Sequence, residues 1–217
     1  LIEFVNKFDD KKVNKIEELY ISKDVLKNAY KSLKKEEKQA LNIAAERIKK
    51  FHKYQIPLEI RYKDNIDVNL GLKYSPIFSA GFYVPGGKAI YPSSVLMNAI
   101  PAFVAGVERR VVVSPISDLH KSSIVLAAAY VANATEFICM GGAHAIAALA
   151  YGTETVTHVY KIVGPGNAYV AEAKRQVFGK VGIDSIAGPS EVLIVCDKSA
   201  NPNHIAIDLL SQAEHDE

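Results

Sequence analysis

The sequence has 217 residues, of which 49% are hydrophobic and 23% are charged, with a formal net charge of +2. This composition excludes a collagen-like or wholly disordered chain, because the apolar fraction is high and the net charge is small. Gly, Pro or charged residues interrupt every apolar run well before the about 18 residues that a membrane span needs, so no membrane segment is expected.

Charge and glycine content divide the chain near residue 80. Residues 1–80 carry 17 Lys and Arg against 12 Asp and Glu, whereas residues 81–217 carry 9 and 12, and Gly71 is the only glycine before residue 81. Glycine is typical of tight turns, so the sequence predicts a solvated helical segment followed by a compact α/β body. The lysines alternate with acids and lack interleaved aromatic residues, so nucleic-acid binding is not expected.

Within the first part, one apolar helix face is indicated over residues 41–51 by Leu41, Ala44, Ala45, Ile48 and Phe51. The alternating stretch 58–62 predicts a short strand, and a second strand is expected near residues 76–79.

The second part repeats a short apolar stretch followed by a helical pattern. The stretches expected to be strands are 110–114, 137–140, 159–163 and 192–196. Helices are expected over 121–132, 143–151 and 168–178, and a last one starts at Pro202 behind the capping residue Asn201. Continuous apolar strands that alternate with helices predict a parallel sheet covered on both faces.

Two cysteines, Cys139 and Cys196, lie inside apolar stretches and form no CxxC pair. We expect both to be buried thiols on strands, as in a protein of the reducing cytoplasm. A thiol buried in this way also argues against a catalytic cysteine of the kind that aldehyde dehydrogenases use.

Three glycine-rich segments could carry chemistry. They are Tyr83-Val84-Pro85-Gly86-Gly87, Gly141-Gly142-Ala143-His144 and Val163-Gly164-Pro165-Gly166-Asn167. The last one links a predicted strand to a predicted helix, where backbone N–H groups can approach a phosphate, but the third glycine of GxGxxG is replaced by Tyr169. A purely structural turn stays open for the glycine segments, and a structural histidine stays open for His144.

Gln212 and His215 lie three positions apart on the last predicted helix and so share one face. Imidazole is a common zinc ligand and an amide oxygen is a rarer one. One of each is too few to hold a catalytic zinc ion. From spacing alone, metal binding by these two residues is the less favoured interpretation.

Taken together, the segments resemble histidinol dehydrogenases. The resemblance rests on the three glycine segments, on the stretches SSVLMNAIPAFVAGV and KIVGPGNAYVAEAKRQV, and on Ala187-Gly188-Pro189-Ser190-Glu191-Val192-Leu193 and DLLSQAEHD. It spans about residues 35–217, more loosely the residues before them, and would cover the first half of a family member.

The resemblance implies zinc-dependent oxidation of L-histidinol through L-histidinal to L-histidine with reduction of NAD, in histidine biosynthesis. It also implies a cytoplasmic homodimer with incomplete Rossmann-like domains, an architecture akin to that of aldehyde dehydrogenases. Residues 1–82 would hold the N-terminal helical segment and begin the first domain. Residues 83–189 would form the NAD-contacting domain, and residues 190–217 would return to the first domain.

The resemblance also implies residue roles. Tyr83 and Asn167 match NAD contacts, and His144 stands where the family pattern has Gln, also an NAD contact. Ser190 matches a substrate contact, and Gln212 and His215 match zinc ligands that adjoin the substrate. The catalytic Glu-His pair and two further zinc ligands of the family would lie beyond residue 217, so no catalytic residue is assigned in this sequence.

Because Leu1 is not a Met and the last helix ends on charged residues without a cap, we expect a truncated chain that is inactive by itself. The alternative hypothesis is a shortened, non-catalytic module for NAD binding or assembly. Zinc affinity separates the two hypotheses, since such a module has no need of zinc.

Overall fold

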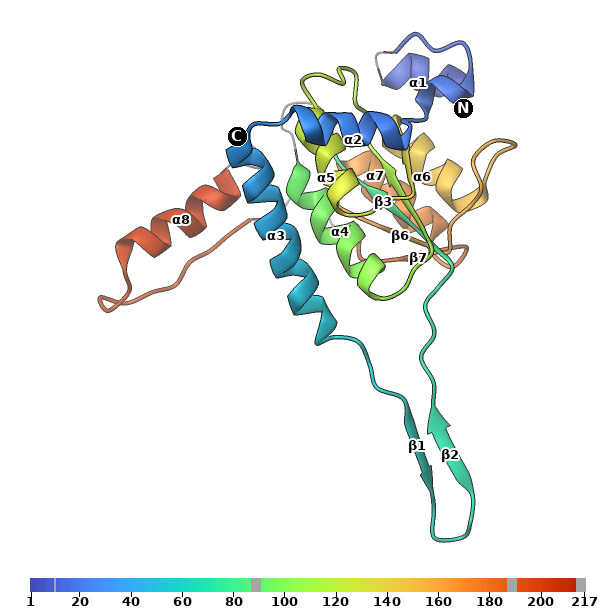
Figure 1. Cartoon of the computed structure of the whole chain (residues 1–217), viewed down its shortest axis with the longest axis vertical. Coiled ribbons are helices and arrows are strands. Elements are labelled where there is room, and N and C mark those ends of the chain that lie inside the picture. Colours follow the sequence, from blue (N-terminus) through green and yellow to red (C-terminus); the bar gives the residue numbers. More distant parts are fainter. Residues whose placement is uncertain (10, 87–90, 187–190, 214–217) are drawn as a thin grey trace.

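The computed structural model describes residues 1–9, 11–86, 91–186 and 191–213. At its centre is a five-stranded parallel sheet with strand order β5-β4-β3-β6-β7 (Figure 1). In chain order the strands are β3 (Ser79–Tyr83), β4 (Arg109–Val113), β5 (Glu136–Ile138), β6 (Lys161–Val163) and β7 (Gly182–Ile183). The predicted parallel α/β fold is confirmed, with three strands within about two residues of their predicted ends and β7 not predicted.

Helices cover both faces of the sheet, which explains why its strands are continuously apolar. One face carries α2 (Lys23–Ser32), α3 (Lys35–Lys53), α4 (Pro92–Val104) and α5 (Ser123–Val131). The other carries α1 (Ile2–Phe8), α6 (Gly142–Tyr151) and α7 (Ala168–Val177). Successive residues of β4 alternate between these two cores: Val112 packs into the first, whereas Val111 and Val113 pack into the second.

The N-terminal segment crosses from one face to the other along the edge of β5. The single-turn helix η1 (Ile16–Leu19) leads into an antiparallel bridge between Tyr20 and Ile138. The Ile21 N–H donates to the carbonyl of Phe137 at 2.9 Å, and the Cys139 N–H donates to the carbonyl of Leu19 at 2.7 Å. This edge of the sheet is therefore paired with the chain itself.

The strand order places β3 at a point where the winding of the sheet reverses. After β3 the chain moves outward through β4 and β5, and it then returns to β6 on the opposite side of β3. In open parallel sheets, the crevice at the carboxyl ends of the strands beside such a reversal is where ligands bind. The fold thus predicts a site at the ends of β3 and β6.

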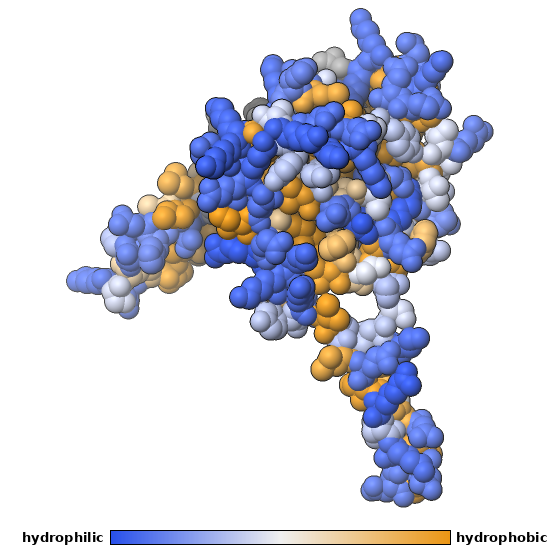
Figure 2. All heavy atoms as spheres, viewed as in Figure 1, coloured by the Kyte–Doolittle hydropathy of each residue, from blue (hydrophilic) through white to orange (hydrophobic). Residues whose placement is uncertain are grey.

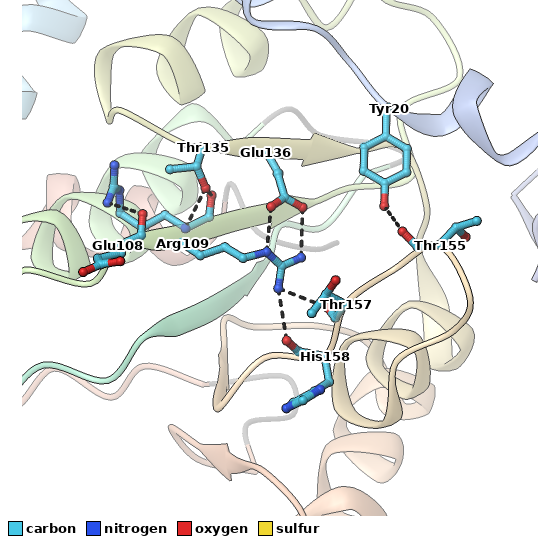
Figure 3. Close-up of polar contacts among 9 residues, drawn as sticks. Tyr20, Glu108, Arg109, Thr135, Glu136, Thr155, Thr157 and His158 are labelled. Carbon is cyan, nitrogen blue, oxygen red and sulfur yellow. Dashed lines mark hydrogen bonds and ion pairs between the residues drawn. The ribbon is translucent and has the colours of Figure 1, made fainter.

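An ion pair joins the opposite, amino ends of β4 and β5 (Figure 3). The Arg109 guanidinium makes two hydrogen bonds to the Glu136 carboxylate, at 2.6 and 2.9 Å, and donates to the carbonyls of Thr157 and His158 at 3.0 Å each. Bidentate pairs of this kind are strong and directional. Here the pair fastens the loop before β6 to the sheet, at the end away from the predicted site.

Two segments project from the body (Figure 1). One is an antiparallel hairpin of β1 (Ile60–Lys63) and β2 (Asn69–Leu72), whose residues are all exposed. The other is the segment 191–201 with α8 (Pro202–Ala213), which has no buried residue. Figure 2 shows apolar side chains at the surface of both projections.

The predicted strand over 192–196 is wrong. The structure gives these residues no strand, and Leu193 and Val195 are 86% and 87% exposed. Alternating apolar residues favour a strand only where a neighbouring strand pairs with them, and no described segment does so here. For the same reason Cys196 is exposed, contrary to expectation, whereas Cys139 is buried as predicted.

The start of α8 is confirmed at Pro202, and the Asn201 side chain accepts a hydrogen bond from the Asn203 N–H at 3.0 Å. Among the residues that the structure describes, none of the helices combines the length and apolar character of a membrane span.

Candidate functional site

A cavity of about 1100 Å³ opens at the carboxyl ends of the strands, where the reversal of winding predicts a site. Its lining comes from α1, from the end of β3, from the segments after β3 and β4, from the whole length of α6 and from the start of α7. Among the lining residues are Phe4, Phe8, Asp9, Tyr83, Gly142, His144 and Asn167. The three residues expected to contact a cofactor, Tyr83, His144 and Asn167, thus face one cavity although they come from three separate segments.

The amino end of α6 is held by two side chains from elsewhere in the chain. The Gly141 N–H donates to Asp9 Oδ2 at 2.9 Å, and the Gly142 N–H donates to the Tyr83 hydroxyl oxygen at 3.1 Å. The first amides of a helix lack intrahelical partners, and a carboxylate there also interacts favourably with the helix dipole. These bonds fix the Gly-Gly segment against β3.

His144 lies in the first turns of α6 and forms one wall of the cavity. Its Nε2 is 3.0 Å from Asp9 Oδ2, and both side chains are more than nine-tenths buried. The rings of Phe4 and Phe8 lie roughly parallel to the imidazole, each with its centroid 6.3 Å away. With Nε2 engaged by Asp9, Nδ1 is the remaining hydrogen-bonding atom of the imidazole.

Tyr83 ends β3 and is almost completely buried. Burial raises the pKa of its phenol; the N–H of Gly142 opposes that rise and the carboxylate of Asp9 adds to it. The phenol is therefore neutral at physiological pH. It accepts a hydrogen bond from Gly142 and keeps its own O–H as a donor.

The turn after β6 brings Asn167 to the cavity and starts α7. The Asn167 side chain caps the helix, because its Oδ1 accepts a hydrogen bond from the Val170 N–H at 3.1 Å. Gly164 has a φ of +120°, and a Cβ at this position would lie 2.1 Å from the carbonyl oxygen of Tyr83. Only glycine lets the turn approach β3 so closely.

The residues expected to hold substrate and zinc are not assembled in the described part of the chain. Ser190 and His215 lie outside the described residues, and Gln212 lies in the last turn of α8. Within residues 1–9, 11–86, 91–186 and 191–213, no group of three or more His, Cys, Asp or Glu side chains could hold a metal ion. One described donor does not fit a zinc site by itself.

Sequence reasoning missed Asp9 and the two phenylalanines of α1, since nothing local in that segment indicates a contact 135 positions away. It also missed Lys174, a buried lysine of α7 that holds the turn after β6. A signal for Lys174 exists, because it interrupts the otherwise apolar helix face formed by Val170 and Val177.

Comparisons with known proteins match this chain to one family. The family model described as histidinol dehydrogenase matches residues 1–217. The chain belongs to the histidinol dehydrogenase family. "Histidinol dehydrogenase 1" of Trichormus variabilis is 62% identical over 181 residues, which cover 83% of this chain and 42% of that protein. "Histidinol dehydrogenase" of Nitrosomonas europaea is 52% identical over 217 residues, covering 100% of this chain and 50% of that protein.

The fold of the family is present as well. The crystal structure of histidinol dehydrogenase from Elizabethkingia anophelis superposes with a TM-score of 0.89 at 37% identity, covering 99% of this chain and 49% of that one. The chain therefore spans about half the length of the histidinol dehydrogenases that it matches. The resemblance drawn from the sequence motifs is confirmed at the level of family and fold.

Proposed function

We propose that the protein containing this chain oxidises L-histidinol through L-histidinal to L-histidine, with NAD as the oxidant and zinc at the substrate site. The chain's part in this reaction is to supply the NAD pocket. The single observation that carries the proposal is the shared cavity of Tyr83, His144 and Asn167 in a chain of this family.

The chemistry of the cavity supports a dinucleotide as its occupant. Aromatic and aliphatic side chains dominate the lining, and the polar groups are few: chiefly Asp9, Tyr83, His144 and Asn167. Pockets for flat, partly apolar cofactors combine a large apolar wall with a few oriented hydrogen-bonding groups. The rings of Phe4 and Phe8 offer faces on which a planar base could stack.

In this proposal NAD supplies the hydride acceptor, and the protein's residues hold it in place. The phenol of Tyr83 and the imidazole of His144 provide hydrogen bonds on the wall of α6. Asn167 provides an amide at the start of α7, where the helix dipole favours the negative charge of a phosphate.

Substrate and zinc contacts at Ser190, Gln212 and His215 are part of the proposal on the strength of the family alone. The acid–base pair and the remaining zinc ligands of the family would come from residues outside this sequence. The 217-residue chain by itself is accordingly expected to bind NAD without catalysing the oxidation. A homodimer and a cytoplasmic location complete the proposal; two unpaired thiols are compatible with that location.

The test is NADH formation from L-histidinol in the presence of zinc, followed at the nicotinamide absorbance band. The protein at its natural length should turn over at a rate ordinary for enzymes, and the isolated chain should not. Absence of turnover by the natural-length protein under zinc-replete conditions would contradict the proposal. The same measurement with the zinc chelated provides the control.

One observation favours a second candidate, a non-catalytic module for NAD binding or assembly. Among the described residues, no group of three or more His, Cys, Asp or Glu side chains could hold a metal ion. The two functions differ in their response to zinc, because an ion that binds only the folded protein raises the melting temperature. A zinc-dependent rise for the natural-length protein supports the enzyme, and its absence supports the module.

A further inference from the structure

One buried charge lies close to the cavity but outside its lining. Lys174 is 1% exposed and stands on the inner face of α7, in line with the buried residues Val170 and Val177. A buried ammonium group is costly unless it is paired and hydrogen-bonded, and an apolar side chain would fill the same space at lower cost. The reason for a lysine at position 174 therefore lies in the groups that its ammonium group binds.

The ammonium group of Lys174 and the carboxylate of Asp184 together hold both polar backbone groups of Gly164. Lys174 Nζ donates to the Gly164 carbonyl at 2.9 Å and pairs with Asp184 Oδ1. The second oxygen of the same carboxylate, Oδ2, accepts the Gly164 N–H at 2.8 Å. One ion pair thus fixes the orientation of this glycine from both sides.

Gly164 is in turn the point where the turn after β6 meets β3. Its α-carbon lies against the backbone of Tyr83 so closely that a Cβ would be 2.1 Å from the Tyr83 carbonyl oxygen. Three residues further along, Asn167 caps α7 and lines the cavity. The orientation of Gly164 therefore sets the spacing between Tyr83 and Asn167, the two cavity residues at the centre of the sheet.

The protonation state of Asp184 is consistent with this arrangement. Burial raises the pKa of Asp184, but the hydrogen bonds from Lys174 and from the amides of Gly164 and Ser185 outweigh it and hold the pKa below its ordinary value. The carboxylate is thus ionised at physiological pH. Neither Lys174 nor Asp184 belongs to the lining of the cavity.

We infer that Lys174 and Asp184 are positioning residues for the cofactor pocket, which lock Gly164 and so hold Asn167 at its distance from Tyr83. The inference rests on the proposed function of the cavity as the NAD site. Neither residue touches the cavity, and both act through the turn. A positional error of about 1 Å at such a turn is enough to cost up to about a hundredfold in a bound complex's reactivity.

The test uses the natural-length protein and the variant Lys174→Met, which keeps most of the length of the side chain and removes its charge. Four quantities are measured: the Kd for NADH by fluorescence titration, the KM for NAD, the KM for L-histidinol, and the melting temperature. Two control variants are Val177→Ala, which destabilises the packing of the last residue of α7, and Lys180→Met, which removes an exposed lysine from the turn that follows this helix.

We expect Lys174→Met to weaken NADH binding and raise the KM for NAD about tenfold or more, with the KM for L-histidinol unchanged. Val177→Ala is expected to lower the melting temperature with the KM for NAD unchanged, and Lys180→Met to change neither. If Lys174→Met does not fold, Asp184→Asn takes its place, because the Asp184 side chain is 34% exposed and its loss of charge is better tolerated. Asp184→Asn should likewise weaken NADH binding.

The outcomes distinguish a failure of the proposed function from a failure of the inference about Lys174 and Asp184. A wild-type protein that does not bind NADH overturns the proposed function, and the inference with it. A wild-type protein that binds NADH, with a Lys174→Met variant that binds it equally well, overturns the inference alone. An equal loss of NADH affinity in Val177→Ala and Lys174→Met would also overturn it, since general destabilisation would then account for the effect.

Discussion

The Asp9 carboxylate and the His144 imidazole lie 135 positions apart in the chain and 3.0 Å apart in space, measured from Oδ2 to Nε2. The same oxygen of Asp9 accepts the Gly141 N–H. A single carboxylate therefore joins α1 to α6 and closes one side of the cavity. Because Asp9 is nearly inaccessible to water, its hydrogen bonds are not exchanged for bonds to solvent.

Replacing Asp9 by Ala leaves the Gly141 amide without its acceptor and frees α1 from the wall of the cavity. We expect the free energy of unfolding to fall by about 1–3 kcal/mol, the cost of an unsatisfied buried group. Urea denaturation measures the change, and Glu3→Gln, an exposed acid on α1, is the matched control. Equal stabilities of Asp9→Ala and Glu3→Gln would show that the bond from Asp9 contributes nothing.

His144→Gln introduces the residue that the resemblance implies for this position, and an amide can also donate to Asp9. We expect NADH binding to survive this change, whereas His144→Leu should weaken it about tenfold, the equivalent of one lost hydrogen bond. Fluorescence titration with NADH compares the two variants. A leucine variant with wild-type affinity would remove His144 from the proposed NAD contacts.

Gly164→Ala is expected to destabilise the protein by about 3 kcal/mol or more, since its Cβ would overlap the Tyr83 carbonyl and its φ is +120°. Gly179 offers a matched control, because its φ is +96° but nothing lies within 4 Å of a Cβ built there. Gly179→Ala should cost only the backbone strain, about 1 kcal/mol. Similar losses in both variants would show that the contact with Tyr83 is unimportant.

The lowered pKa of Asp184 makes part of the stability dependent on pH. The ionised carboxylate is favoured in the folded state, so its contribution is fully present above the ordinary pKa of 3.8. It is lost as the pH falls through the lower pKa of the folded state. Between about pH 5 and about pH 3, Asp184→Asn should therefore lose less stability than the wild type does. Parallel acid curves would contradict this.

The two thiols should differ in reactivity. Cys139 is 3% exposed and its pKa is raised chiefly by burial, although Lys11 nearby lowers it, whereas Cys196 is exposed. A thiol reagent should modify Cys196 of the folded 217-residue chain rapidly and Cys139 only on unfolding. Intact mass after brief treatment, with Cys196→Ser as the control, gives the answer. Rapid modification of the Cys196→Ser variant would contradict the burial of Cys139.

Much of the sheet could be predicted because its signal is local. Val111, Val112 and Val113 form an uninterrupted apolar run, as expected for a strand buried on both faces, and glycines mark the turns after β3, β5 and β6. β7 was missed because a two-residue strand leaves no periodic pattern. The strand expected over 192–196 was wrong because alternation describes a side-chain preference, while a strand also requires a neighbour.

The cavity could be predicted in part. Tyr83, His144 and Asn167 stand in glycine-rich motifs at the ends of strands, so their segments were identified from the sequence, and the structure brings them to one cavity. Asp9 could not be found in this way, because its partners are more than 130 positions distant. Lys174 could have been suspected as a charge on an apolar helix face, but its partner Asp184 becomes evident only when β6 and β7 lie side by side.

The N-terminal segment that crosses the edge of β5 cannot dock until much of the chain has been synthesised on the ribosome. Lys11 donates to the carbonyl of Cys139, and Tyr20 to that of Thr155, at separations of 128 and 135 positions. A ribosome adds about 5–20 residues per second, so residues 1–21 wait roughly ten seconds for the partners on which they dock. During that interval they are accessible to proteases and chaperones, and the wall formed by α1 is completed only after α6 has been made.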